Sequence, residues 1–309
     1  MDDYSTGDIK GWWRGRLRAA GAVAVGFARA EPVDEEAWAR YGAWLEEGRN
    51  GELRYMRNYP ELRRDPRGLL EGARTLISVA WPYLPERLRD PALPFIARYA
   101  YAPDYHKSIR KVLKPVLAEW RRWTGTEVRV CVDSAPVLER WWAMKAGVGF
   151  TGRNGCLIVP GYGSWVYLTE ILVTQETEPD SPCTLSCAGC GACVKVCPTG
   201  ALGDDGLVDC RRCLSALTVE SPGQACGAYG GRVMLAGCDR CQEVCPHNRG
   251  ARPTGVAAFA TVRGILTLDG EEIGGMTTEE FRERYGSSAL SRMGLEGLRA
   301  NLEAACLED

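Results

Sequence analysis

Apolar positions in the first 180 residues recur with helical spacing in some stretches and form short unbroken runs in others. Residues 34–49 are amphipathic and follow Asp34, a suitable helix N-cap. Residues 107–123 are also amphipathic, and Pro115 within them predicts a kink or a restart of the helix. Short apolar runs predict strands at 22–27, 75–80, 127–132, 156–159 and 165–173. This mixture predicts an α+β fold.

Weaker patterns complete the outline. Segment 95–101 is a further strand candidate, and Pro136 suits the first turn of a helix over 136–145. Near the C-terminus, helices are predicted at 278–285 and at about 295–306. We therefore expect three parts, which are a domain of residues 1–180, a cysteine-rich domain of residues 181–250 and a helical segment of residues 251–309.

The cysteine-rich domain carries two runs with iron-sulfur spacing. The first run reads C-x2-C-x2-C-x3-C-P and contains Cys187, Cys190, Cys193 and Cys197. The second run reads C-x2-C-x3-C-P and contains Cys238, Cys241 and Cys245. In bacterial ferredoxins with the first spacing, three thiolates bind one 4Fe-4S cluster and the fourth reaches the other cluster. The sequence therefore predicts two 4Fe-4S clusters.

The crossed arrangement of such ferredoxins assigns four thiolates to each cluster. One set is Cys187, Cys190, Cys193 and Cys245, and the other is Cys197, Cys238 and Cys241 with one further cysteine. Spacing leaves both Cys213 and Cys210 open as the eighth ligand. The alternatives are structural zinc, a disulfide framework, or one cluster beside a degenerate site. Zinc sites usually use two separated cysteine pairs, and disulfide frameworks belong to small secreted chains.

Composition narrows the class of protein. The chain has 309 residues, of which 45% are hydrophobic and 25% are charged, as in ordinary globular proteins. Its N-terminal residues lack the apolar region of a signal peptide, and no apolar run approaches the ~18 residues of a membrane span. Clustered thiols without an export signal predict a cytoplasmic protein with no membrane partner, and we expect a monomer. The only two histidines, His106 and His247, argue against a histidine-rich metal site.

Charge is distributed unevenly although the net charge is only −2. Residues 98–129 hold eight basic side chains against three acidic ones, and residues 264–309 hold ten acidic against four basic. The basic segment is either a solvated face or a surface for phosphates.

Candidate chemistry in the first domain centres on Asp133. No G-x-G-x-x-G motif follows a predicted strand, and there is no P-loop and no D-x-H-x-x-G segment of the kind that supplies a histidine ligand to cobalamin. Asp133 follows the strand at 127–132 and precedes the helix at 136–145. An acid in this place is either catalytic or a helix cap.

Seven pieces of the chain together resemble the epoxyqueuosine reductase family. They are A-R-Y-A-Y-A-P-D-Y-H (97–106), V-D-S-A-P-V-L-E-R (132–140), A-G-V-G-F-T-G-R-N (146–154), Y-G-S-W-V-Y-L-T-E-I-L (162–172), C-x2-C-x2-C-x3-C-P-T-G-A (187–201), C-L-S-A-L-T-V-E (213–220) and G-C-D-R-C-Q-E-V-C-P (237–246). Their order and spacing agree with the family over about residues 35–250.

The resemblance implies a nitroreductase-like cobalamin-binding domain followed by a ferredoxin-like domain with two 4Fe-4S clusters. It implies an oxidoreductase that reduces epoxyqueuosine in tRNA to queuosine, with base-off cobalamin fed through the clusters from a low-potential electron donor. It selects Cys213 as the eighth ligand and Asp133 as the proton donor. The cobalamin contacts that it implies are Arg63, Ala97, Asp133, Asn154, Ser164, Cys238 and Asp239.

The implied chemistry carries further expectations. A leaving epoxide oxygen needs a proton, so we expect burial beside the corrin to raise the pKa of Asp133 until it is protonated at neutral pH. The basic segment 98–129 would then face tRNA phosphates. The alternatives are a reductive dehalogenase, against which the missing twin-arginine signal argues, and a non-catalytic carrier of the ferredoxin type.

Overall fold

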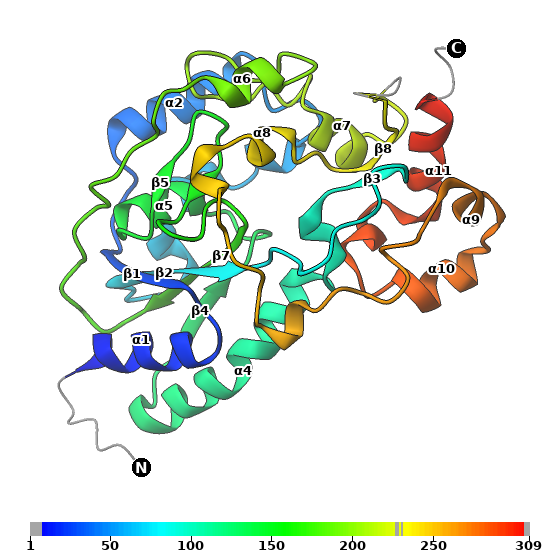
Figure 1. The fold of residues 1–309 in the computed structure, drawn as a ribbon. Coiled ribbons are helices and arrows are strands. Elements are labelled where there is room, and N and C mark those ends of the chain that lie inside the picture. Colours follow the sequence, from blue (N-terminus) through cyan, green and yellow to red (C-terminus); the bar gives the residue numbers. More distant parts are fainter. Residues whose placement is uncertain (1–7, 226–228, 230, 306–309) are drawn as a thin grey trace.

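The structure is a computed structural model, and it describes residues 8–225, 229 and 231–305. Its centre is a four-stranded antiparallel sheet with the strand order β1-β2-β7-β4 (Figure 1). The strands are β1 (Ala24–Arg29), β2 (Thr75–Pro82), β4 (Val128–Cys131) and β7 (Val166–Val173). All of β2 is buried because both faces of the sheet are covered.

Side chains that alternate along β2 enter two different cores. Ile77 and Val79 pack with α1 (Ile9–Ala19) and α4 (Tyr105–Thr124) on one face. Leu76 and Ala80 pack with α5 (Glu139–Lys145) on the other face. The period of two along a strand therefore accounts for the layered α+β fold that the sequence predicts.

Three predicted elements differ in the structure. The helix α4 continues through Pro115 without a restart, because its apolar side is buried on both sides of that residue. The strand expected at 95–101 is only β3 (Phe95–Ile96), followed by the 3-10 helix η3 (Arg98–Tyr101). The helix expected from Pro136 begins at Glu139.

The remaining elements connect or cover this centre. They are α2 (Glu35–Glu46), η1 (Arg54–Arg57), α3 (Pro60–Arg64), η2 (Pro66–Leu69), β5 (Phe150–Thr151), β6 (Leu157–Ile158), α6 (Ala192–Val196), α7 (Leu214–Glu220), β8 (Met234–Ala236), α8 (Arg240–Glu243), η4 (Pro246–Asn248), η5 (Ala257–Phe259), α9 (Gly270–Gly275), α10 (Thr278–Tyr285), η6 (Ala289–Arg292) and α11 (Gly294–Ala305). The predicted helix at 278–285 is confirmed, with a capping box between Thr277 and Glu280. Cys306, the last residue of the helix predicted at 295–306, lies outside the described residues, as does Cys226.

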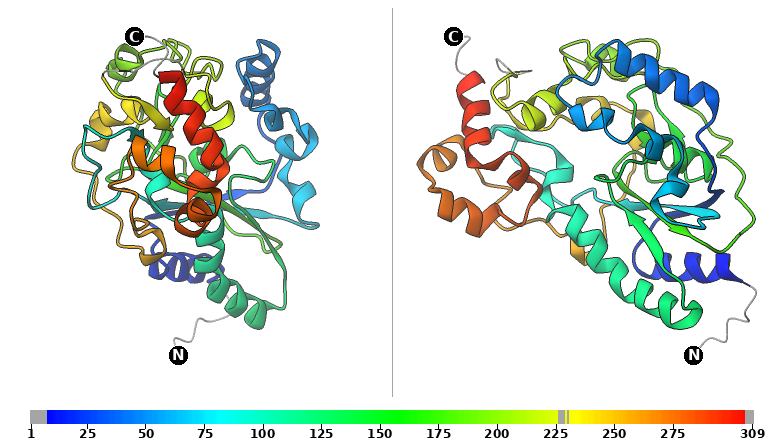
Figure 2. Two further views of the ribbon diagram at one scale, coloured as in Figure 1. Left: turned by 90° about the vertical axis from the view of Figure 1, so that its right-hand side faces the viewer. Right: turned by 180° about the vertical axis from the view of Figure 1, so that it is seen from behind.

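The three parts of the chain share cores. Strand β3 pairs in parallel with β8, which comes from the cysteine-rich part. Ile96, Leu235 and Leu298 belong to one hydrophobic cluster, so all three parts contribute to it. Figures 1 and 2 place the cysteine-rich loops with α6 at the opposite end of the molecule from α1. The boundaries at 180 and 250 stay predictions, since these parts do not have separate cores.

None of the helices in the described ranges combines the length and the apolar character that crossing a membrane requires.

Candidate active site

Asp133 lies in a tight turn directly after β4. Its φ is 53°, a left-handed conformation that aspartate tolerates better than most residues. Its backbone N–H donates a 2.6 Å hydrogen bond to Oε1 of Glu139, the first residue of α5. The alternative in which Asp133 caps this helix is wrong, because the N-cap residue is Leu138 and no side chain caps the helix.

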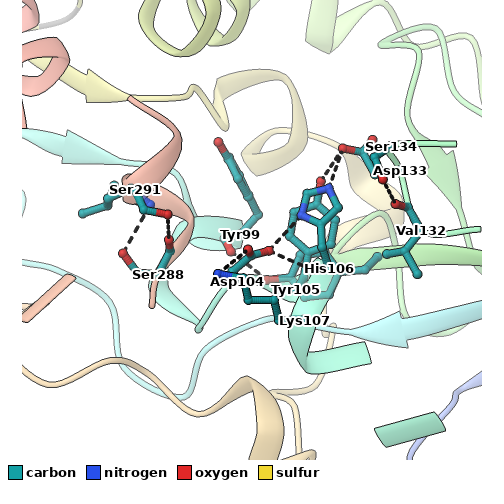
Figure 3. A network of polar contacts seen from close by, with 12 residues as sticks. Tyr99, Asp104, Tyr105, His106, Lys107, Val132, Asp133, Ser134, Ser288 and Ser291 are labelled. Atoms are coloured by element: carbon teal, nitrogen blue, oxygen red, sulfur yellow. Dashed lines mark hydrogen bonds and ion pairs between the residues drawn. The ribbon is translucent and has the colours of Figure 1, made fainter. Parts of the chain in front are cut away.

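The start of α4 holds the Asp133 carboxylate. The Tyr105 hydroxyl donates a 2.8 Å hydrogen bond to Oδ2 of Asp133, and Nε2 of His106 lies 3.1 Å from the same oxygen (Figure 3). Nδ1 of His106 lies 2.8 Å from Oδ1 of Asp104. The Asp133 side chain is still 57% exposed, so a substrate can reach the carboxylate.

These contacts set the proton affinities of the group. Burial acts to raise the pKa of Asp133, but the hydrogen bonds from His106 and Tyr105 outweigh it and hold the pKa below its ordinary value of 3.8. The hydrogen bond to Asp133 raises the pKa of His106 above 6.5. The expected raised pKa of Asp133 is therefore wrong for this structure. Both ring nitrogens of His106 face carboxylate oxygens, which accept and do not donate, so the proton of the pair resides on His106. The sequence pattern did not predict this role of His106.

Four of the implied cobalamin contacts lie against the segment formed by β8 and α8. The Asn154 amide donates to the Cys241 carbonyl at 3.4 Å, and the Ser164 hydroxyl bonds Gln242 at 2.9 Å. Asp239 accepts from the Arg98 N–H at 2.8 Å, and burial raises its pKa to about 6. Ala97 donates its N–H to the carbonyl of Ala236 and is buried.

Arg63 occupies a different position, on α3. It is buried, and its guanidinium donates to the carbonyls of Asn58 at 3.0 Å and Tyr55 at 2.8 Å. Burial raises the pKa of Tyr55 to about 12, and the charges of Glu220 and Asp133 contribute to that rise. Arg63 therefore supports the loop that carries Tyr55.

The first predicted set of cysteines lines one pocket. The pocket is bordered by Cys187, Cys190, Cys193 and Cys245, together with Asn154 and His247. Within the described ranges, no three cysteine, histidine or acidic side chains approach closely enough to hold a single metal ion. A zinc ion would need thiolates about 2.3 Å from one centre. The pocket brings together the four thiols that the sequence spacing assigns to one cluster.

Thiols of the second set lie close enough to raise one another's pKa values. Burial raises the pKa of the Cys213 thiol, and charge on Cys197 raises it further. Burial raises the pKa of Cys238 to about 12, with a contribution from charge on Cys213. The pKa of Cys241 is raised by a hydrogen bond with Cys156, by burial, and by charge on Cys238 and Cys213. Cys156 is a neighbour that the spacing did not predict.

Cys210 borders a different cavity from the first set of cysteines. Its N–H donates to the Arg49 carbonyl at 2.7 Å, and it lines a separate cavity with Gly51 and Glu220. Burial raises the pKa of the Cys210 thiol to about 12, and charge on Cys213 contributes to the rise. The arrangement favours Cys213 over Cys210 as the eighth ligand.

Two family models match the chain. The model described as "Epoxyqueuosine reductase QueG, DUF1730" covers residues 63–134, which include the segments of Tyr105, His106 and Asp133. The model described as "4Fe-4S double cluster binding domain" covers residues 186–248. The second match confirms the prediction of two 4Fe-4S clusters in preference to zinc or a disulfide framework.

Relatives and solved structures agree over almost the whole chain. An epoxyqueuosine reductase of Leadbetterella byssophila is 36% identical over 98% of both chains, and one of Gloeobacter violaceus is 38% identical over 94% of both. A crystal structure of epoxyqueuosine reductase with an epoxyqueuosine-modified tRNA-Tyr stem loop has a TM-score of 0.83 at 27% identity, over 96% of this chain and 80% of that one. The Bacillus subtilis enzyme, solved with its catalytic aspartate loop swung out of the active site, has a TM-score of 0.80 at 27% identity, over 96% of this chain and 81% of that one. The chain therefore belongs to the epoxyqueuosine reductase family.

Proposed function

We propose that this protein reduces epoxyqueuosine to queuosine at the wobble position of tRNA. The observation that carries the proposal is the Asp133–His106 pair, which stands exposed at the end of β4 in a chain that matches epoxyqueuosine reductases over its length. This function implies action in the cytoplasm, where tRNA is modified, and supply by a low-potential electron donor.

The Asp133–His106 pair supplies a proton to the substrate. Converting an epoxide to an alkene takes up two electrons and two protons and releases the oxygen as water. The oxygen that leaves the carbon needs a proton as the bond breaks. His106 holds the proton of the pair, and its Nε2 lies 3.1 Å from Oδ2 of the more exposed Asp133 side chain, so the proton would pass through Asp133 to the substrate. Tyr105 keeps the carboxylate oriented, because burial and the charge of Asp133 raise the pKa of its hydroxyl well above 10.

The cysteine sets would hold the clusters. One cluster would bind Cys187, Cys190, Cys193 and Cys245, and the other would bind Cys197, Cys213, Cys238 and Cys241. These assignments rest on the spacing in the sequence and on the two groups of thiols described above.

The residues that would hold cobalamin are Arg63, Ala97, Asp133, Asn154, Ser164, Cys238 and Asp239. Bound cobalamin supplies a strongly reducing cobalt centre for the epoxide carbon. Both ring nitrogens of His106 are engaged by Asp104 and Asp133, so this side chain would serve the carboxylate of Asp133 and would not hold the cofactor itself. Tyr55 and Tyr99 are large aromatic side chains near Asp133. Burial contributes most to their raised pKa values, other acidic residues contribute next, and the charge of Asp133 adds to the rise.

The basic side of α4 would meet tRNA phosphates. Exposed cations follow one another along the helix, at Lys107, Arg110, Lys111, Lys114 and Arg122. From the first to the last they span about 22 Å at roughly 1.5 Å per residue. The same helix begins at Tyr105, which bonds Asp133. A phosphate backbone on this surface would run toward the acid.

Single-turnover reduction with Asp133→Asn tests the acid. The asparagine keeps the size of the side chain but cannot carry the proton, so we expect a loss of at least about 100-fold in rate with both clusters retained. Nucleoside mass spectrometry after tRNA digestion measures the product, and the iron content is the control. A rate within about threefold of the wild-type rate would remove Asp133 as the acid.

A further inference from the structure

Two carboxyl groups lie behind Asp133 and have no part in the chemistry described so far. Glu170 stands in the middle of β7 and is fully buried. Its cross-strand partners are Ser78 on β2 and Cys131 on β4. Because cross-strand partners share a face of the sheet, these three side chains lie beneath α5, which begins with Glu139.

Glu170 has few partners in this position. The Ser78 hydroxyl donates to Oε1 at 3.2 Å, whereas Oε2 is buried without any N–H or hydroxyl donor. None of the ion pairs found within residues 8–225, 229 and 231–305 includes Glu139 or Glu170. The charged or titratable groups that face the two carboxyls are Asp133, Cys131, Arg140 and, beside Cys131, Arg129. A buried carboxylate without a cation is costly unless it is protonated or bonded.

The Glu139 carboxyl lies between Asp133 and Glu170 and can bond both residues. Its Oε1 accepts the backbone N–H of Asp133 at 2.6 Å. The Glu139 carboxyl also lies close enough to the Glu170 carboxyl, whose Oε2 has no other partner, for the two groups to share a hydrogen bond. Two carboxyl groups can bond each other only when one of them carries a proton to donate. Burial raises the pKa of Glu139 to about 8 and raises the pKa of Glu170 well above 4.5, in agreement with a retained proton.

We propose that Glu139 is a positioning residue, which shares one proton with Glu170 and thereby fixes the backbone of Asp133 in its left-handed turn. The carboxylate of Asp133 is held on one side by Tyr105 and His106, from α4. The backbone N–H of Asp133 is held by Glu139, from α5, which accepts its hydrogen bond. The turn is thus clamped between two helices on opposite faces of the sheet. Loss of Glu139 frees the backbone even though both carboxylate contacts remain.

Amide hydrogen exchange on the full chain with its clusters tests this directly. Glu139→Ala removes the acceptor, so exchange in the segment 132–138 should rise at least about tenfold. Glu139→Gln keeps an accepting oxygen for the Asp133 N–H and gains an amide donor for Glu170, so exchange should stay within about twofold of the wild-type rate. Glu279→Ala is the matched control, since Glu279 is an exposed residue in the first turn of α10. This control should leave 132–138 unchanged.

Infrared spectroscopy of the wild-type protein gives a second readout that does not need a variant to fold. It should show the carbonyl stretch of a protonated carboxyl at pH 7, and this band should be lost in Glu139→Gln. Exchange within twofold in Glu139→Ala with both clusters retained, or no protonated carboxyl in the wild-type protein, would overturn the proposal. The proposal about Glu139 rests on the proposed function only in treating Asp133 as the acid. A failure of that function would change turnover but not the exchange of the turn.

Discussion

Cys213 is the residue for which sequence spacing left an alternative and the structure favours one answer. Replacing it with alanine leaves three thiols, Cys197, Cys238 and Cys241, in the second set. A 4Fe-4S cluster needs four thiolates, and the first set stands in a separate pocket. The iron content should therefore fall from about eight to about four atoms per chain.

The chain offers matched controls in the same region. Cys210→Ala changes a thiol only three positions away, but one that lines another cavity. Cys156→Ala removes the thiol that hydrogen bonds Cys241. We expect both variants to keep about eight irons, because neither residue belongs to a set of four.

Iron and sulfide analysis after anaerobic reconstitution measures the cluster content, and electron paramagnetic resonance of the reduced protein shows which cluster remains. Full iron in Cys213→Ala together with half the iron in Cys210→Ala or Cys156→Ala would refute the ligand assignment. A loss of all iron in Cys213→Ala would refute the independence of the two sets.

Three further predictions concern protons and charge. Single-turnover rates should decline as pH rises through the raised pKa of His106, because the pair then loses its proton. His106→Gln should move this decline to lower pH. An unchanged pH profile in the variant would contradict proton transfer from His106. The free energy of unfolding should contain a component that falls between about pH 4.5 and pH 8, because in that window the native state keeps the proton that unfolded Glu139 releases. The double variant Glu139→Gln/Glu170→Gln should lack this component, which is on the order of 1 kcal/mol per pH unit in chemical denaturation, and an identical pH dependence would count against the shared proton. Lys111→Gln with Lys114→Gln should lower the slope of log affinity for tRNA against log salt by about one to two, whereas Arg282→Gln on α10 should not, and equal slopes would place the tRNA elsewhere.

Local features of the sequence predicted part of the site. The cysteine spacing sufficed for two clusters because ligand loops are short and contiguous. Asp133 was identifiable at the end of a strand, and the capping box at Thr277 marked its helix correctly. His106 was present in a family segment, but its bond to Asp133 joins residues 27 positions apart and depends on how α4 crosses the sheet.

Other features depend on packing, which the sequence pattern does not report. Glu170 lies within an apolar run that predicts a strand. The neighbouring residues in the sequence do not indicate that Glu139, at the start of α5, packs against it. Pro115 carries a helix-breaking pattern, yet burial of Leu113, Val116 and Trp120 sustains the helix around it. The pKa of Asp133 is lowered and not raised, because hydrogen bonds from His106 and Tyr105 outweigh the effect of burial. The sequence pattern indicated only the burial.

Reduction of epoxyqueuosine in tRNA through cobalamin can be measured directly on this chain. The most direct measurement incubates the cluster-loaded protein with epoxyqueuosine-containing tRNA, cobalamin and a low-potential reductant, and analyses the digested nucleosides by mass spectrometry. We expect queuosine when cobalamin and reductant are both present, and none when either is omitted. Unchanged epoxyqueuosine from protein that holds both clusters and binds cobalamin would contradict this expectation.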